Sequence, residues 1–434
     1  MGRARRRISR WVVVALIAAT TVASGASATD DGEWPAQQGD QTSSDEPEAA
    51  ASKPDESPAQ ADGMGGPSSV GAQLVRDGRH RKYEQLQKPK EWLQENYALS
   101  IGADYNLLAQ QVSEGPGPTD GVGGVLRFYG SWALVNRGAA EDTGSFVFKV
   151  EYRHSLGTEL PAVSVLPTAG AAGISGPTFG DNGGVLTNLY WTQSFADNRF
   201  AFEVGVVDTT DYLDVYGLVN PWADFNNLAF STSPAIAVPN QGLGAAARFM
   251  VTPRWYVLGG LADADADPHR PQDFFSSFAE GEYFTHVEFG RVGSWDTRYS
   301  DNIHLLLWQV DDRVEAGVDG GWGATVSWGF EYGGRWMPFV RGGWSDGGGT
   351  VVDRTASAGV GYRINQHDDY FGFAANWGRA PDNPRNQYQL ETYCRTHISP
   401  GLSVAPSAQV VLHPADNPEI SSLWLIAVRL RAVW

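Results

Sequence analysis

The sequence predicts an all-β protein, specifically a transmembrane antiparallel β-barrel of 16 strands with short periplasmic turns and long extracellular loops. Three features of the chain support this prediction. Strand-like runs rich in glycine and aromatic residues fill residues 97–434. Within these runs apolar and polar side chains alternate, and successive side chains of a strand point to opposite faces. Short and long connections also alternate, as they do in outer-membrane barrels.

Three segments precede the predicted barrel. Residues 1–28 combine a basic start, an apolar stretch and a small-residue cleavage site, the pattern of a secretory signal peptide. Residues 29–75 are rich in Asp, Glu, Pro, Ser and Ala and bury too little apolar surface to fold, so we expect a disordered acidic linker. Residues 76–96 are charged and allow a short helix interrupted by Pro89, and we expect a solvated periplasmic segment.

The predicted barrel occupies residues 97–434, and its strands have the length that a tilted membrane-crossing strand needs. The predicted strands are 97–111, 124–136, 145–156, 186–196, 200–212, 242–252, 255–264, 283–293, 303–312, 322–333, 338–348, 354–364, 370–380, 387–397, 402–414 and 422–434. Tight turns such as 196–199 and 365–368 alternate with long loops such as 157–185 and 213–241. An even strand count puts both ends of the barrel on the periplasmic side, where the last strand must pair with the first.

The final run shows the expected alternation. Trp424, Ile426 and Val428 share one apolar face, while Arg429 and Arg431 lie on the other. In a membrane barrel the first face contacts lipid and the second lines a wet lumen. A soluble all-β protein such as a propeller is the competing interpretation, but the chain has no repeat of fixed period.

Composition and motifs exclude several functions. A net charge of −18 argues against a nucleic-acid partner. Cys394 is the single cysteine, so no internal disulfide is expected. The acidic run 263–268 lacks the turn glycine and the glutamate of a calcium loop, and the histidines are scattered, so we expect no metal site. The zinc-protease, phosphate-loop and dinucleotide-binding motifs are absent, and the sequence predicts neither an enzyme nor a cofactor.

The face opposite the apolar one supplies the predicted pore lining, and the 213–241 loop adds one tryptophan. The predicted substrate-binding or pore-lining residues are Arg127, Lys149, Glu151, Arg153, Glu203, Trp222, Arg341, Glu391, Arg395, Gln409, Arg429 and Arg431. The same alternation places Arg248 inward. Interleaved arginine, glutamate and glutamine offer donors and acceptors together, which suits neutral polyhydroxylated solutes better than ions of one sign. For each residue taken singly, ordinary wall polarity remains an alternative.

The loop 213–241 is long and aromatic, with Tyr216, Trp222 and Phe225 beside several Asn and Asp residues. We expect it to fold inward and narrow the channel, where aromatic faces stack on sugar rings and amides bind hydroxyl groups. A loop that only stabilises the barrel mouth is the alternative.

Three stretches carry a family resemblance: FEVGVVDTTDYLDVYG, YQLETYCRTHISPGLSVAPSAQVVLHPADNP and the final VRLRAVW. Over roughly residues 92–434 the chain resembles the carbohydrate-selective porin (OprB) family of Gram-negative outer membranes. The resemblance implies a 16-stranded barrel that passes sugars such as glucose by facilitated diffusion, with inward-folded loops and a polar constriction. The positions that match polar positions of the family pattern are Glu151, Arg153, Glu203, Glu391, Arg395 and Gln409.

Two departures from the family pattern stand out. The acidic segment before Trp92 is longer than the pattern needs, and Cys394 stands where another aromatic residue is expected. The resemblance also implies that the terminal aromatic Trp434 serves as the outer-membrane assembly signal.

Together these arguments predict an outer-membrane porin for monosaccharides such as glucose. A non-conducting structural or adhesive barrel is the alternative. The expected partners are carbohydrate solutes, outer-membrane lipids and the assembly machinery, and no nucleic acid. The preferred sugar, the constricting loops and the choice between a monomer and a homotrimer stay open.

Overall fold

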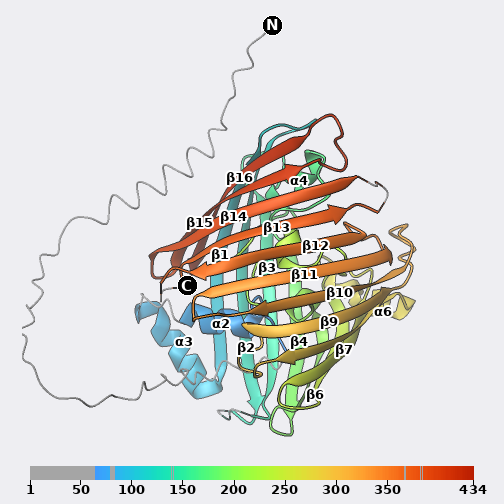
Figure 1. Ribbon diagram of the computed structural model, residues 1–434. Coiled ribbons are helices and arrows are strands. Elements are labelled where there is room, and N and C mark those ends of the chain that lie inside the picture. Colours follow the sequence, from blue (N-terminus) through green and yellow to red (C-terminus); the bar gives the residue numbers. More distant parts are fainter. Residues whose placement is uncertain are drawn as a thin grey trace, which may run out of the picture.

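A computed structural model describes residues 64–78, 84–137, 139, 141–365, 368–381, 383 and 385–434. The predicted signal peptide and most of the predicted linker lie outside these residues. Sixteen strands form one closed antiparallel barrel, in which each strand pairs with its neighbours in sequence and β1 pairs with β16 (Figure 1). This arrangement confirms the predicted fold class.

Each predicted run overlaps one observed strand. The strands are β1 (Leu99–Val112), β2 (Asp120–Val135), β3 (Gly144–Ser155), β4 (Gly183–Phe195), β5 (Phe200–Val207), β6 (Gly242–Met250), β7 (Trp255–Asp263), β8 (Tyr283–Val292), β9 (Asp301–Val310), β10 (Gly321–Phe330), β11 (Trp336–Gly347), β12 (Arg354–Arg363), β13 (Tyr370–Arg379), β14 (Asn386–Ser399), β15 (Leu402–Leu412) and β16 (Ser422–Val433). The predicted run 200–212 is too long, because Asp208 caps the 3-10 helix η2 (Thr209–Asp211) by accepting the Thr210 N–H.

Side-chain burial alternates along the strands as predicted. In β16, Leu423, Leu425 and Arg429 are buried, whereas Trp424 and Ile426 are exposed. The exposed apolar side chains lie on the outer face, and the polar ones point into the lumen. A closed sheet with such an outer face satisfies its backbone hydrogen bonds without water on that side.

The two ends of the barrel differ. One end carries the turns after even-numbered strands, such as 196–199 between β4 and β5, together with the start of β1 and the end of β16. We call it the turn end. The other, the loop end, carries the connections 156–182 and 208–241. Helix α3 (Glu84–Tyr97) lies at the turn end and α6 (Phe274–Glu280), which follows η3 (Pro271–Asp273), at the loop end (Figure 1).

Helix α3 continues through Pro89, whereas we expected that residue to interrupt it. Among the described residues, no helix is long and apolar enough to cross a membrane.

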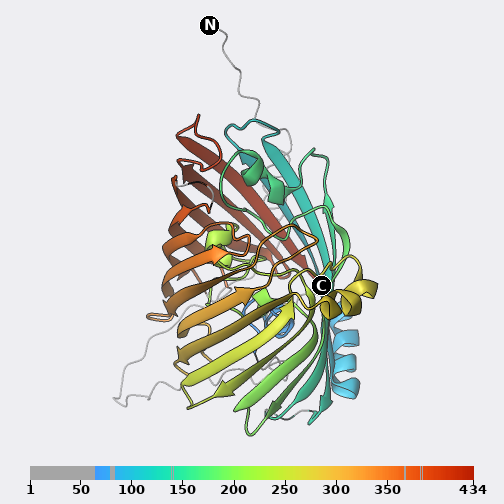
Figure 2. The same ribbon diagram turned by 90° about the vertical axis from the view of Figure 1, so that its right-hand side faces the viewer.

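Three segments fold into the space that the strands enclose. The β3–β4 loop, with η1 (Ala162–Ser164) and α4 (Val165–Thr168), packs on the inner faces of β1, β2, β15 and β16. The β5–β6 loop, with η2 and α5 (Leu228–Ser231), packs on β11, β13 and β14. Figure 2 shows the strands surrounding these short elements.

The third inward segment is residues 64–78, which ends in α2 (Val70–Gly78). Met64 and Val70 are buried, and Val70 packs against Tyr129 and Val147 of the inner wall. The segment therefore lies inside the barrel. This position differs from the disordered linker expected to residue 75 and from the solvated periplasmic segment expected from residue 76.

Candidate functional site

The predicted lining residues of the strands all point into the lumen, but most are buried beneath the inward segments. Arg153 is the most accessible of those in ion pairs, with a side chain that is 15% exposed. The buried members are Arg127, Lys149, Glu151, Glu203, Arg341, Glu391, Arg395, Gln409, Arg429 and Arg431. Most of these side chains therefore contact folded segments of the protein rather than an open water channel.

Asp104 on β1 joins two of the predicted arginines. Its carboxylate accepts a hydrogen bond of 2.7 Å from the Nε of Arg127 on β2. The same carboxylate also accepts a hydrogen bond from Arg431 on β16. Arg431 also donates to Gln73 and Asp77 of α2, at 2.9 Å each. The network thus ties the seam between the first and last strands to the N-terminal segment in the lumen.

A second network fixes the β5–β6 loop to β14 and β16. The Glu391 carboxylate accepts the backbone N–H groups of Asn226 at 2.8 Å and Asn227 at 2.9 Å. Arg429 donates to the carbonyl oxygens of Pro221 and Asp224 and to the Asn226 side chain. Because strand side chains hold the loop by its backbone, the loop folds inward, as predicted.

Two further arginines bind carboxylates of the same loop. Arg395 on β14 pairs with Asp224 at 3.0 Å. Arg341 on β11 pairs with Asp214, which also contacts His304 Nε2 at 3.0 Å. Burial alone would raise the pKa of Asp214, but the Arg341 charge and the hydrogen bond from His304 hold that pKa at about 2. The carboxylate therefore stays ionised at neutral pH.

Amide side chains anchor the β3–β4 loop. Gln409 on β15 donates to the Ser175 hydroxyl at 2.8 Å, and Ser175 donates to Gln110 on β1 at 2.6 Å. Gln387 and Gln389 on β14 both donate to the Ala172 carbonyl oxygen. These bonds place the loop across the β14–β15–β1 part of the wall.

The remaining predicted residues divide between the wall and the loop. Lys149 pairs with Asp211 of η2 at 3.2 Å. Arg153 pairs with Glu151 at 2.7 Å near the loop end of β3. The Arg127 guanidinium lies over the ring of Trp222 in the β5–β6 loop, with its carbon 3.9 Å from the ring centre. Arg127 therefore occupies one face of the Trp222 ring.

Several residues of these networks were not predicted. Asp104 shares the inward face of β1 with polar residues, so the alternation of that strand could have revealed it. Asp214, His304 and Asp77 gave no local signal, because their partners lie far away in sequence.

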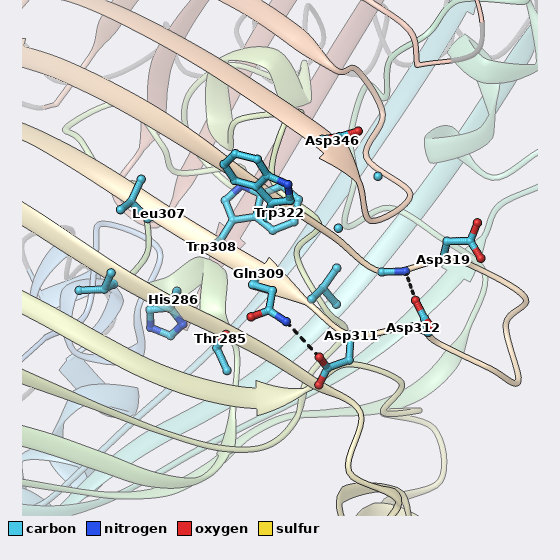
Figure 3. A pocket seen from close by; sticks show the side chains of 15 residues that line it. Thr285, His286, Leu307, Trp308, Gln309, Asp311, Asp312, Asp319, Trp322 and Asp346 are labelled. Carbon is cyan, nitrogen blue, oxygen red and sulfur yellow. Dashed lines mark hydrogen bonds between the residues drawn. The ribbon is translucent and has the colours of Figure 1, made fainter.

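Two cavities lie near the loop end. One of about 1230 Å³ spans β8 to β11, with Asp311, Asp312 and Asp346 beside its tryptophans (Figure 3). Its lining includes Leu307 and Trp322, which are 42% and 54% exposed on the apolar outer face. Buried residues of the inner face, His286 and Trp308 among them, also line it, so the lining does not assign the cavity to one face of the wall.

The second cavity, of about 370 Å³, lies between the loops at the barrel mouth. Ala172, Gly173, Ala380 and Pro381 line it. Since Gln387 and Gln389 bind Ala172, this cavity lies directly beside the amides of β14.

The interior presents paired charges, amides and hydroxyl groups. In the part of the chain that the structure describes, no cluster of His, Cys, Asp or Glu could hold a metal ion. Such a wall can exchange hydrogen bonds with a polar neutral solute, because it offers donors and acceptors together.

A closed barrel of 16 strands, with an apolar outer face, polar inward side chains and loops folded into its lumen, defines a porin. The family described as carbohydrate-selective porin, OprB family, matches residues 148–328 and 313–433. The chain belongs to this family. Family and fold are those of channels rather than enzymes, and they imply the outer membrane as the location.

Among solved structures, one of Pseudomonas putida OprB supports this fold. A high-pH structure of Pseudomonas putida OprB is 15% identical, with a TM-score of 0.64, over 81% of this chain and 97% of that chain. A low-pH structure of the same protein is 12% identical, with a TM-score of 0.48, over 82% of this chain and 98% of that chain. A triple mutant of Rhodopseudomonas blastica porin is 12% identical, with a TM-score of 0.47, over 77% of this chain and 100% of that chain. No curated protein matches the chain.

Replacement of Glu391 should weaken the attachment of the β5–β6 loop. Glu391→Ala leaves the buried N–H groups of Asn226 and Asn227 without their acceptor. We expect the free energy of unfolding to fall by about 3 kcal/mol, measured by denaturant titration of the refolded protein. Glu280→Ala, at an exposed position of α6, is the matched control. Equal stability of both variants would contradict the role given to Glu391.

The Asp214 contacts should weaken in acid. The pKa of Asp214 is about 2 in the folded protein, below an unfolded value of about 3.9, so its stabilising contribution is full above about pH 4 and is lost towards pH 2. Pepsin cleavage of the β5–β6 loop should therefore rise between these pH values. In Asp214→Asn this part of the pH dependence should disappear, and identical profiles for the two proteins would refute the assignment.

Proposed function

We propose that this porin lets neutral carbohydrates, monosaccharides such as glucose among them, diffuse across the outer membrane into the periplasm. The observation that carries the proposal is the family match over residues 148–433. The mixed lining supports it, because the partly exposed pair of Arg153 and Glu151 offers a donor and an acceptor to hydroxyl groups. Transport of this kind needs a gradient and no catalytic step or cofactor.

The predicted lining residues take two roles in this proposal. Arg153, paired with Glu151, contacts the solute near the loop end, since its side chain stays partly exposed. Buried residues such as Glu391, Arg395 and Arg429 shape the path by holding the inward loops. The cavity beside Gln387 and Gln389 is the proposed entrance from the loop end.

A non-conducting barrel is the second candidate function. The observation that favours it is the burial of nearly all inward charges beneath the two loops and residues 64–78. In that case the barrel would serve a structural or adhesive role.

The surroundings of the barrel follow from the same proposal. We propose that residues 1–28 direct export as a signal peptide and that the exposed outer face, including Trp424 and Ile426, contacts outer-membrane lipids. We further propose that the assembly machinery recognises the terminal strand with Trp434, and that the porin assembles as a monomer or homotrimer.

Planar-bilayer recording of the refolded full-length protein separates the two candidates. We expect stepwise conductance that added glucose reduces, with weaker block by larger disaccharides. Deletion of residues 64–78 should raise the conductance, because these residues occupy the lumen. Complete absence of current, in both the intact and the deleted protein, would sink the porin proposal and favour the structural barrel.

The Arg153–Glu151 pair provides a test of the site. Loss of a hydrogen bond to a charged group costs about 1.5–3 kcal/mol, so Arg153→Ala and Glu151→Ala should each weaken sugar block roughly tenfold or more. Liposome swelling with glucose provides an independent flux measurement. Arg335→Ala, which changes an arginine at the turn end, is the control. If both variants pass sugar like the unmodified protein, these residues contribute only wall polarity.

A further inference from the structure

Arg248 near the turn end of β6 differs from the paired arginines of the lumen. Its side chain is 1% exposed, and its Nη2 donates to the Asn198 carbonyl oxygen at 2.7 Å. Within the described part of the chain, its Nε and Nη1 have no hydrogen-bond partner, and no carboxylate is among the charges that act on it. Arg127 and Arg431, in contrast, share the Asp104 carboxylate. The Arg248 charge is therefore buried with unused donors.

Arg248 and a second arginine, Arg298, both lie over the ring of Trp295. The guanidinium carbons of Arg248 and Arg298 lie 3.9 Å and 4.8 Å from the centre of the Trp295 ring. Arg298 donates to the carbonyl oxygens of Trp295 and Gly65, while its Nε has no partner among the described residues. Trp295 and Arg298 belong to the β8–β9 turn, so both arginines lie at the turn end of the lumen beside the same ring.

This arrangement lacks the counter-charge that a buried cation needs. Neither Asp296 of the same turn nor Asp301, the first residue of β9, is among the charges that act on Arg248 in the described chain. A ring face stabilises a cation, but it leaves the in-plane N–H groups of the guanidinium unused. Buried polar groups without partners are rare, and an unseen water or ion is a common reason for them.

We propose that Arg248 and Arg298 form an anion-binding site at the turn end of the lumen, for the carboxylate or phosphate group of a solute. Arginine suits this ligand class because its planar N–H donors match the oxygen atoms of both groups. The bound oxyanion would accept from the unused nitrogens and offset the repulsion between the two guanidinium groups. The anion could arrive as inorganic phosphate or as part of an acidic sugar. The acidic-sugar source rests on the proposed function, whereas the site itself does not.

Equilibrium binding to the refolded full-length protein tests the site without any need for conduction. Titration calorimetry uses inorganic phosphate, gluconate and neutral glucose, with chloride at matched ionic strength as background. We expect phosphate, gluconate or both to bind. Arg248→Gln and Arg298→Gln should each weaken that binding about tenfold or more, because each removes a charge-assisted contact. Arg298→Gln changes a half-buried turn residue, so it keeps the test open if Arg248→Gln fails to fold.

The control is Arg254→Gln, which removes an exposed arginine at the same end of the barrel and should bind like the unmodified protein. Binding of phosphate alone identifies a phosphate site, and binding of gluconate identifies an acidic sugar as ligand. The proposal is overturned if neither anion binds, or if the Arg298→Gln protein binds as tightly as the Arg254→Gln control. A channel that conducts no sugar would leave this result unaffected, so the two proposals fail separately.

Discussion

Pairing of β1 with β16 leaves every strand of the sheet with two neighbours, and the faces, ends and lumen of the barrel follow from it. The hydrocarbon of a membrane offers no hydrogen bonds, so an open edge would leave a row of backbone groups unsatisfied. Closure also divides each strand into an outer and an inner face. The chain satisfies both demands, with Trp424 on the outer face of the closing strand and Arg431 on its inner face.

Inside the closed barrel, the charged side chains of the strands need hydrogen-bond or ion-pair partners, because the inward loops cover them and exclude water. Strand arginines meet carboxylates of the β5–β6 loop, as in the pairs Arg395–Asp224 and Arg341–Asp214. Glu391 instead binds loop backbone. A buried pair adds little net stability, but loss of one partner is costly, so such contacts fix the position of a loop strongly. These polar side chains of the inner wall thus place the β5–β6 loop inside the barrel.

The inner wall is not uniform. Around the β1–β16 seam, Arg431 joins Asp104 to the N-terminal segment, so the strand closure and the segment in the lumen depend on shared side chains. On the side of β6 and the β8–β9 turn, Arg248 and Arg298 keep unused donors. The inner wall therefore carries paired charges at the β1–β16 seam and unpaired cationic donors on the side of β6.

The sequence by itself determined the strands, their number and the face of each side chain, because the two-residue period of a strand is a local pattern. It also marked the β5–β6 loop as unusual through its length and aromatic residues. Only the tertiary structure decided that residues 64–78 lie in the lumen, that Trp222 stacks on Arg127, and which carboxylate each arginine binds. Those contacts join residues far apart in the chain, such as Asp104 and Arg431, and the closed barrel alone brings them together.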